Sequence, residues 1–187
     1  STKTTKGAED IAIGYVSLFG EAHLMDTGLR LGVSYIPYAL ESETTDNTRR
    51  DNCINNNGNG TNCSGTATTQ TVQVDVEDLI TMYVAYHHEV DLGLVDSVFV
   101  KGGVIEADVM TKEKLASGSQ YGNTTLSGQF LGLGVEKNMD NGLFVRVEGN
   151  YMQFEAASLT STTNADNTAK ISDLNGLSGK ISIGKSF

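Results

Sequence analysis

The chain of 187 residues is long enough for a single domain with one core, which we expect to span residues 1–187. Pro occurs once, Trp is absent and Gly occurs 21 times, a composition that favours strands joined by turns over packed helices. The net charge of -10 and the lack of a basic surface exclude nucleic acid as an expected partner.

Seven segments alternate apolar and polar side chains, as strands with two unlike faces do. They are Ile11–Leu24, Gly28–Leu40, Val72–His88, Ser97–Met110, Thr125–Lys137, Leu143–Glu155 and Leu174–Phe187. Leu143–Glu155 is the clearest, with valines on one parity and Arg146 and Glu148 on the other. Two residues break the apolar faces, Asp78 in the third segment and Lys101 in the fourth, where Lys101 is expected to snorkel towards a membrane boundary.

The connections alternate between short and long. Short turns are predicted at Met25–Thr27, Val90–Asp96 and Asn138–Asn141, and long polar loops at Glu41–Gln70, Thr111–Thr124 and Ala156–Ser172. Turns on one side and loops on the other are typical of outer-membrane barrels. The absence of an apolar run of about 18 residues excludes a transmembrane helix but not strands, whose hydropathy signal is weaker.

Alternation alone fits a soluble antiparallel sheet as well as a membrane barrel. The polar faces, however, carry Gly, Ser and charges of both signs, which suit the interior of a narrow barrel whose apolar faces meet lipid. The charge network predicted in that lumen comprises Glu21, Arg30, Glu106, Asp108, Glu136, Arg146, Glu148 and Lys180. Solvated charges on the outside of a soluble sheet are the competing interpretation.

Cys53 and Cys63 lie in an Asn- and Gly-rich stretch without residues that would complete a zinc site. The interpretation we favour is a disulfide that closes a loop in an oxidising compartment, and two free surface thiols are the alternative.

The sequence ends in GKISIGKSF, in which Gly179, Ile181, Ile183 and Phe187 share a parity. Tyr35, Tyr86, Tyr151 and Phe99 are candidates for interfacial aromatic girdles. The ending resembles the C-terminal assembly signal of outer-membrane barrel proteins. The whole chain resembles small barrels of the OmpA/OmpX type and predicted barrels of marine Gram-negative bacteria, with YIPY at Tyr35–Tyr38 and the last strand as the closest local matches.

This resemblance implies an all-β fold, an antiparallel up-and-down transmembrane barrel of about eight strands in the bacterial outer membrane. Bacterial barrels have even strand numbers, and seven segments are one short. Either a first strand lies upstream of Ser1, or Val72–His88 is not a single strand. We favour the upstream strand because STKTTKGAED is polar and unpatterned, as the long loops are.

No catalytic pattern emerges. His87 and His88 are adjacent, so a strand aims them at opposite faces and they cannot chelate a metal together. The glycines of Gly132–Glu136 are interpreted as lumen space, because the stretch lacks the third glycine and the helix of a nucleotide-binding fingerprint. We expect no catalytic residues, no metal and no cofactor, and therefore no enzyme.

The function expected is an outer-membrane barrel with a structural or narrow-pore role for small solutes, with membrane lipid and the barrel-assembly machinery as partners. The alternative is a surface adhesion or recognition module that binds a ligand or phage through the loops at Cys53–Cys63, Lys112–Asn123 and Ser158–Asn167. A barrel enzyme with polar residues converging at its rim is a third reading.

Overall fold

The computed structural model is an antiparallel all-β structure. It describes residues 14–25, 27–41, 45–50, 53–55, 61–63, 67–114, 121–163, 168–171 and 174–187, in part as backbone alone. These residues contain no helix, and hence none long and apolar enough to cross a membrane.

Seven strands follow one another in the main sheet in the order β1-β2-β7-β8-β9-β10-β13, each antiparallel to the next. Their bounds are β1 Leu18–Leu24, β2 Leu29–Tyr35, β7 Ala67–Glu89, β8 Ser97–Lys114, β9 Thr124–Asn138, β10 Leu143–Phe154 and β13 Asn175–Lys185. Each coincides with one of the seven predicted segments, although β7, β8 and β9 extend beyond the predicted bounds. An alternating segment can place every second side chain on one face only as a strand. The up-and-down order is confirmed.

Six short strands were not predicted. They are β3 Leu40–Glu41, β4 Thr45–Arg50, β5 Cys53–Asn55, β6 Thr61–Cys63, β11 Ala157–Thr160 and β12 Thr168–Ile171. β3 and β4 pair with the long strand β7 and bring the main sheet to nine strands, whereas β5–β6 and β11–β12 form separate two-stranded sheets. Five of the six occur in the predicted long loops, whose polar composition masks strand periodicity, and β3 lies at the border between a predicted strand and the first of these loops.

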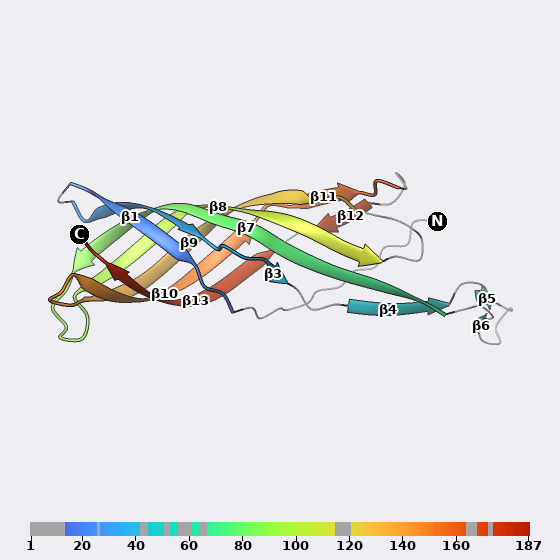
Figure 1. Ribbon diagram of the computed structural model, residues 1–187, viewed down its shortest axis with the longest axis horizontal. Helices are drawn as coiled ribbons and strands as arrows, with labels where there is room; N and C mark the ends of the chain where they lie inside the picture. The colour runs from blue at the N-terminus through green and yellow to red at the C-terminus, as the bar shows by residue number, and fades with distance from the viewer. Residues whose placement is uncertain are drawn as a thin grey trace.

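The short turns gather at one end of the sheet and the longer connections at the other (Figure 1). The chain end at Phe187 lies at the turn end, and β4, β5 and β6 lie at the opposite, loop end, beyond most of the sheet. The turn after β9 contains Gly142 at φ 77°, in the left-handed region that glycine adopts without strain.

Two hydrogen bonds join two of the turns. Asp96, between β7 and β8, accepts a 2.7 Å hydrogen bond from Lys137 Nζ and another of 2.7 Å from the backbone N–H of Asn138, at the end of β9. The bond from Lys137, and then that from Asn138, lowers the pKa of the Asp96 carboxyl below its ordinary value.

We expect Lys137→Met to raise the pKa of Asp96 back towards its ordinary value, which a carboxyl NMR titration measures. A carboxyl whose pKa is lowered in the folded state stabilises the fold above its unfolded-state pKa, and this contribution is lost as the pH falls through the folded-state value. Lys185→Met, an exposed change at the same end, should leave the Asp96 titration unchanged. An unaltered Asp96 pKa in Lys137→Met would contradict the assignment.

The sheet is curled but not closed. The inner face, which carries Glu136 and Arg146, is concave, because Glu21 on β1 contacts Arg146 on β10 across it at 2.7 Å. In the described part of the chain, β1 and β13 are the two ends of the strand order and do not pair with each other. The structure is therefore a curled antiparallel sheet with an open seam between its first and last strands.

Candidate functional site

Arg146 is the centre of a charge cluster on the inner face and is only 2% exposed. Its Nη1 and Nη2 bind the two carboxylate oxygens of Glu21 at 2.7 and 3.0 Å, and its Nε and Nη2 bind Glu136 Oε2 at 3.0 and 2.6 Å. Arg30 completes the cluster, with its guanidinium 3.3 Å from Glu136 and 3.5 Å from Glu21. We call these four residues the inner network. Its two cations and two carboxylates balance, which a buried charge cluster requires.

Strand register explains the contact between Arg146 and Glu136, but not their contacts with Glu21 and Arg30. Arg146 and Glu136 are direct partners in the β9–β10 hairpin, and so face the same side of the sheet. Glu21 and Arg30 come from the first hairpin, more than 100 residues away in sequence, and reach the other two only because the sheet curls. Sequence parity predicts the face of all four, but not this meeting across the interior.

Aromatic rings enclose the Arg146 guanidinium. Its Cζ lies 4.8 Å from the ring centre of Phe99, 5.2 Å from that of Phe144 and 5.5 Å from that of Phe19. Cation–π contacts in such a water-poor setting reinforce the ion pairs. Phe99 also stacks on the buried His87 at 4.8 Å, so it lies inside the sheet and its predicted role in an interfacial girdle is wrong.

A second ion pair lies on the inner face between β8 and β10. Lys101 Nζ is 2.7 Å from Glu148 Oε1, and both side chains are buried. Asn150 donates a 3.3 Å bond to the same carboxylate oxygen, and the rings of Tyr83 and Phe130 lie 4.9 and 5.7 Å from the Lys101 ammonium. The predicted exposed position of Lys101 on an apolar outer face is therefore wrong.

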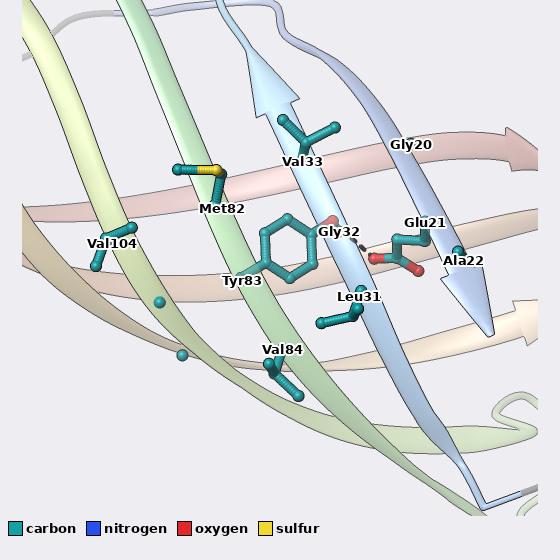
Figure 2. Close-up of a pocket in the computed structure, with 12 residues that line it drawn as sticks. Gly20, Glu21, Ala22, Leu31, Gly32, Val33, Met82, Tyr83, Val84 and Val104 are labelled. Atoms are coloured by element: carbon teal, nitrogen blue, oxygen red, sulfur yellow. Dashed lines mark hydrogen bonds between the residues drawn. The ribbon is translucent and has the colours of Figure 1, made fainter. Parts of the chain in front are cut away.

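Glycines on the inner face leave space for large neighbours. Figure 2 shows the Tyr83 ring of β7 passing over Gly32 of β2, so that its hydroxyl donates a 2.7 Å bond to Glu21 Oε1 on β1. A Cβ at Gly32 would overlap that ring. At Gly134, a Cβ would lie 2.5 Å from both Phe99 Cζ and the carbonyl oxygen of Val147. Gly134, predicted to provide lumen space, provides it for Phe99.

We expect Gly134→Ala to lower the free energy of unfolding by about 1 to 3 kcal/mol, because the added methyl group overpacks against a ring and a backbone carbonyl. Gly149→Ala is the matched control, since Gly149 lies on the outer face of the adjacent strand with no heavy atom within 4 Å of the added carbon. Urea unfolding followed by circular dichroism measures both. Equal effects would contradict the proposed packing role.

Six of the eight residues predicted for the charge network lie on the inner face: Glu21, Arg30, Glu136, Arg146, Glu148 and Lys180. The other two, Glu106 and Asp108, do not. Glu106 is exposed between the buried Ile105 and Ala107, and Asp108 binds Thr125 Oγ1 on the same outer side. Their predicted inner position is wrong. Apolar residues occur at both odd and even positions of β8, so hydropathy could not show which face of this strand lies inside.

Lys101 was expected outside, and the inner residues Asn150 and His87 were not included in the predicted charge network. His87 is buried, with Nδ1 3.4 Å from Ser97 Oγ and 4.0 Å from Glu136 Oε1, while its neighbour His88 is exposed. The adjacent histidines thus point to opposite faces, as a strand predicts. One feature of the sequence could have indicated the inner position of Lys101: it is a lone cation among the alternate residues of β8 that include Phe99 and Ile105.

The outer face carries an apolar belt that is unusually exposed. Leu133, for example, is 68% exposed and Ile181 75%. The belt comprises Leu31, Val33, Met82, Val84, Val100, Val104, Leu131, Leu133, Val147, Tyr151, Leu177, Ile181 and Ile183. A shallow groove of about 730 Å³ crosses it over β1, β2, β7 and β8, where Gly20, Ala22 and Gly102 are small (Figure 2). Large apolar residues thus cover the outside while charges occupy the inside.

A bulge at Asp78 ends the belt on β7. Asp78 has φ 48°, and the register of β7 against β8 shifts between Glu77 and Ile80. Such a bulge turns the residues beyond it to the other face. Val76 therefore pairs with the buried Val109 inside, while Asp75 shares the outer parity with Lys112. The Asp75 side chain is nevertheless fully buried, and its carboxylate raises the pKa of Lys112. Towards the loops, the outer face is consequently polar.

A cavity of about 630 Å³ opens on the inner face towards the loop end. Its apolar wall includes Ile36, Phe130, Met152 and Phe154. Its polar lining includes Lys101, Glu148, Asn150 and Lys180, together with Ser17 from the lead into β1 and Ser178 from β13. The cavity thus lies beside the open seam.

Two predicted features stay predictions. The β5–β6 register places Cys53 opposite Cys63, but their side chains lie outside the described part of the structure, and the disulfide is not seen. Gly179, Ile181, Ile183 and Phe187 are all exposed on the outer side, with Phe187 just beyond β13, and their assembly role is untested. Of the expected girdle, Tyr35, Tyr86 and Tyr151 are partly exposed on the outer face.

Comparison of the chain with known protein families, with curated proteins and with solved structures finds no match.

Proposed function

We propose that this chain is a transmembrane β-barrel of the bacterial outer membrane, with a structural or narrow-pore role. The observation that carries the proposal is the inverted distribution of side chains, with an apolar belt outside and paired charges inside. In water, such a belt would be a large aggregation-prone patch. In lipid it is the required surface, and the charges level with the belt must turn inward.

The expected lumen is narrow. The inner network links β1, β2, β9 and β10 through contacts of 2.6 to 3.5 Å, and the aromatic rings around Arg146 occupy the space beside it. Small barrels have interiors that side chains fill. Such a lumen supports slow passage of small solutes at most, or a purely structural role.

We also propose that the chain is related to small barrels of the OmpA/OmpX type. This relation implies membrane lipid and the barrel-assembly machinery as partners. The exposed Phe187 beside the apolar Ile181 and Ile183 suits recognition by that machinery. Deleting Phe187 should then slow assembly in cells more than refolding into detergent, which separates recognition from stability.

The test is whether the protein folds only in detergent or lipid. Refolded into micelles, it should migrate on an unheated gel differently from the boiled protein, and planar bilayers should report little or no conductance. A folded, soluble monomer in buffer without detergent would overturn the proposal. A large, steady conductance would overturn the narrow lumen while leaving the barrel intact.

The extended loop end favours a second candidate, a surface recognition module. β7 has 23 residues, against 7 in β1 and β2, and its upper part pairs with β4 beyond most of the sheet (Figure 1). A ribbon on this side would project outward from the cell. Replacing residues 45–70 with a short turn should abolish binding of a surface ligand or phage without changing heat-modifiability. Replacing 158–167, another of the loops expected to bind, in the same way tests whether more than one loop contributes.

A further inference from the structure

The inner face changes in character along β10, from the turn end to the loop end. Its inward residues are, in that order, Arg146, Glu148, Asn150, Met152 and Phe154. Charged side chains thus give way to an amide and then to apolar side chains. The Phe19 ring lies 5.5 Å from both the Arg146 guanidinium and the ammonium of Lys180, which lines the cavity of about 630 Å³. The inner network therefore lies between this cavity and the turn end.

The charged side chains that line the cavity do not balance. They are Lys101, Glu148 and Lys180, two cations and one carboxylate. Glu148 binds Lys101 at 2.7 Å and is also the direct strand partner of Lys180 across β10 and β13, so one carboxylate faces two lysines. Lys180 is the half-buried one of the two, whereas Lys101 is buried. The lining thus has a formal charge of +1, which a bound monoanion at Lys180 would neutralise.

Two hydroxyl groups of the lining lie close to Lys180 in the fold. Ser178 is two residues before Lys180 on the same face of β13, and Ser17 is two residues before Phe19, whose ring the lysine contacts. Ser178 Oγ accepts a 3.3 Å bond from Asn150 Nδ2, and Ser17 Oγ is buried with no hydrogen-bond partner among the described residues. An ammonium and two hydroxyl donors suit a carboxylate, which only accepts hydrogen bonds.

The loop side of the cavity is apolar. Ile36, Ile105 and Phe130 are buried there, and Met152 and Phe154 are half-buried. We call these five residues the apolar wall. The cavity volume falls in the range of small-molecule sites, about 300 to 1,000 Å³. It has room for a short alkyl tail against the apolar wall, where the hydrophobic effect favours burial of that tail.

We propose that this cavity binds a small organic monocarboxylate with an apolar tail, of the medium-chain fatty acid class. The carboxylate lies at Lys180, Ser17 and Ser178, and the tail lies along the apolar wall. The site goes beyond a structural or narrow-pore role, which needs no ligand. Only the direction of entry, from outside the cell through the loop end, rests on the proposed membrane barrel.

Photolabelling of the full chain in phosphatidylcholine nanodiscs tests the site. Octanoic acid that carries a diazirine in its tail should label the apolar wall, as mass spectrometry of the peptides identifies. Octanoate should compete with the probe. Acetate, which lacks the tail, and octanol, which lacks the charge, should not. Labelling confined to the outer belt, or octanol that competes as well as octanoate, would overturn the proposal.

The carboxylate position is tested by Lys180→Met, a variant in which Glu148 keeps its 2.7 Å contact with Lys101. Its apparent affinity for octanoate should fall about tenfold or more, the loss expected when a hydrogen bond to a charged group is removed. Lys185→Met, an exposed change on the same strand, is the matched control and should bind octanoate as the unchanged chain does. Equal affinities in the two variants would overturn the assigned position.

The tail position is tested by a change that fills the cavity. Ser34→Trp adds a ring to the lining from β2 and should abolish labelling of the apolar wall, whereas Val33→Trp, on the outer face of the same strand, should leave it unchanged. Normal heat-modifiability without labelling of the apolar wall rejects the ligand site alone. Loss of heat-modifiability rejects the barrel alone, because the same labelling in buffer then decides the site.

Discussion

Arg146→Met is expected to lower the free energy of unfolding by about 3 to 5 kcal/mol, the range for breaking a buried ion pair by removing one partner. The guanidinium makes four hydrogen bonds to Glu21 and Glu136, and without it Arg30, at 3.3 to 3.5 Å, is the one arginine left to balance two carboxylates in the inner network. The chain has no Trp, so circular dichroism or the unheated gel must report unfolding in urea.

Arg30→Met is the matched control. The Arg30 side chain is more exposed and its contacts are longer, so the loss should be clearly smaller. Combining Arg146→Met with Glu21→Gln should recover much of the stability, because the remaining cation, Arg30, then balances the remaining carboxylate, Glu136, at 3.3 Å. Equal losses for the two arginines, or no recovery in the double variant, would contradict the central position of Arg146.

The prediction of the strands succeeded where hydropathy contrast was strong. In β10 the outer Val147 and the inner Arg146 and Glu148 differ so much that parity alone orients the strand. In β8, Val98, Val100 and Val104 lie outside while Phe99 and Ile105 lie inside. Both faces are apolar there, and no local pattern separates them. What orients β8 is the Lys101–Glu148 contact, which depends on another strand.

The bulge at Asp78 limited the prediction in a different way. A period of two assumes an unbroken register, and one extra residue inverts the face of everything beyond it. Val76 and Met82 share a parity in sequence, yet Val76 pairs with a buried residue and Met82 is exposed. The sequence did contain an indication of the bulge: Asp78 is an acidic residue among apolar residues of the same parity, and Asp is a residue type that tolerates positive φ.

The contacts between the first hairpin and strands β9 and β10 could not be predicted from the sequence, for a third reason. Arg146 and Glu136 could be paired from their hairpin, but Glu21 joins them only through the curl of the whole sheet. Curl is a property of summed strand twist and register, not of any one segment. The predicted composition of the inner face was therefore more reliable than the predicted contacts within it.

Lys101→Met should cost about 3 to 5 kcal/mol of unfolding free energy, because Glu148 would then stay buried with only the Asn150 bond at 3.3 Å and no cation within 4.0 Å among the described residues. Adding Glu148→Gln should recover part of that loss. Lys137→Met, which breaks an exposed pair with Asp96, should cost far less than Lys101→Met, because water screens an exposed ion pair. Urea unfolding in micelles compares the three variants. A Lys101 loss no larger than that of Lys137 would mean that water reaches the Lys101–Glu148 pair, and the lumen would then be wider than the inner network implies.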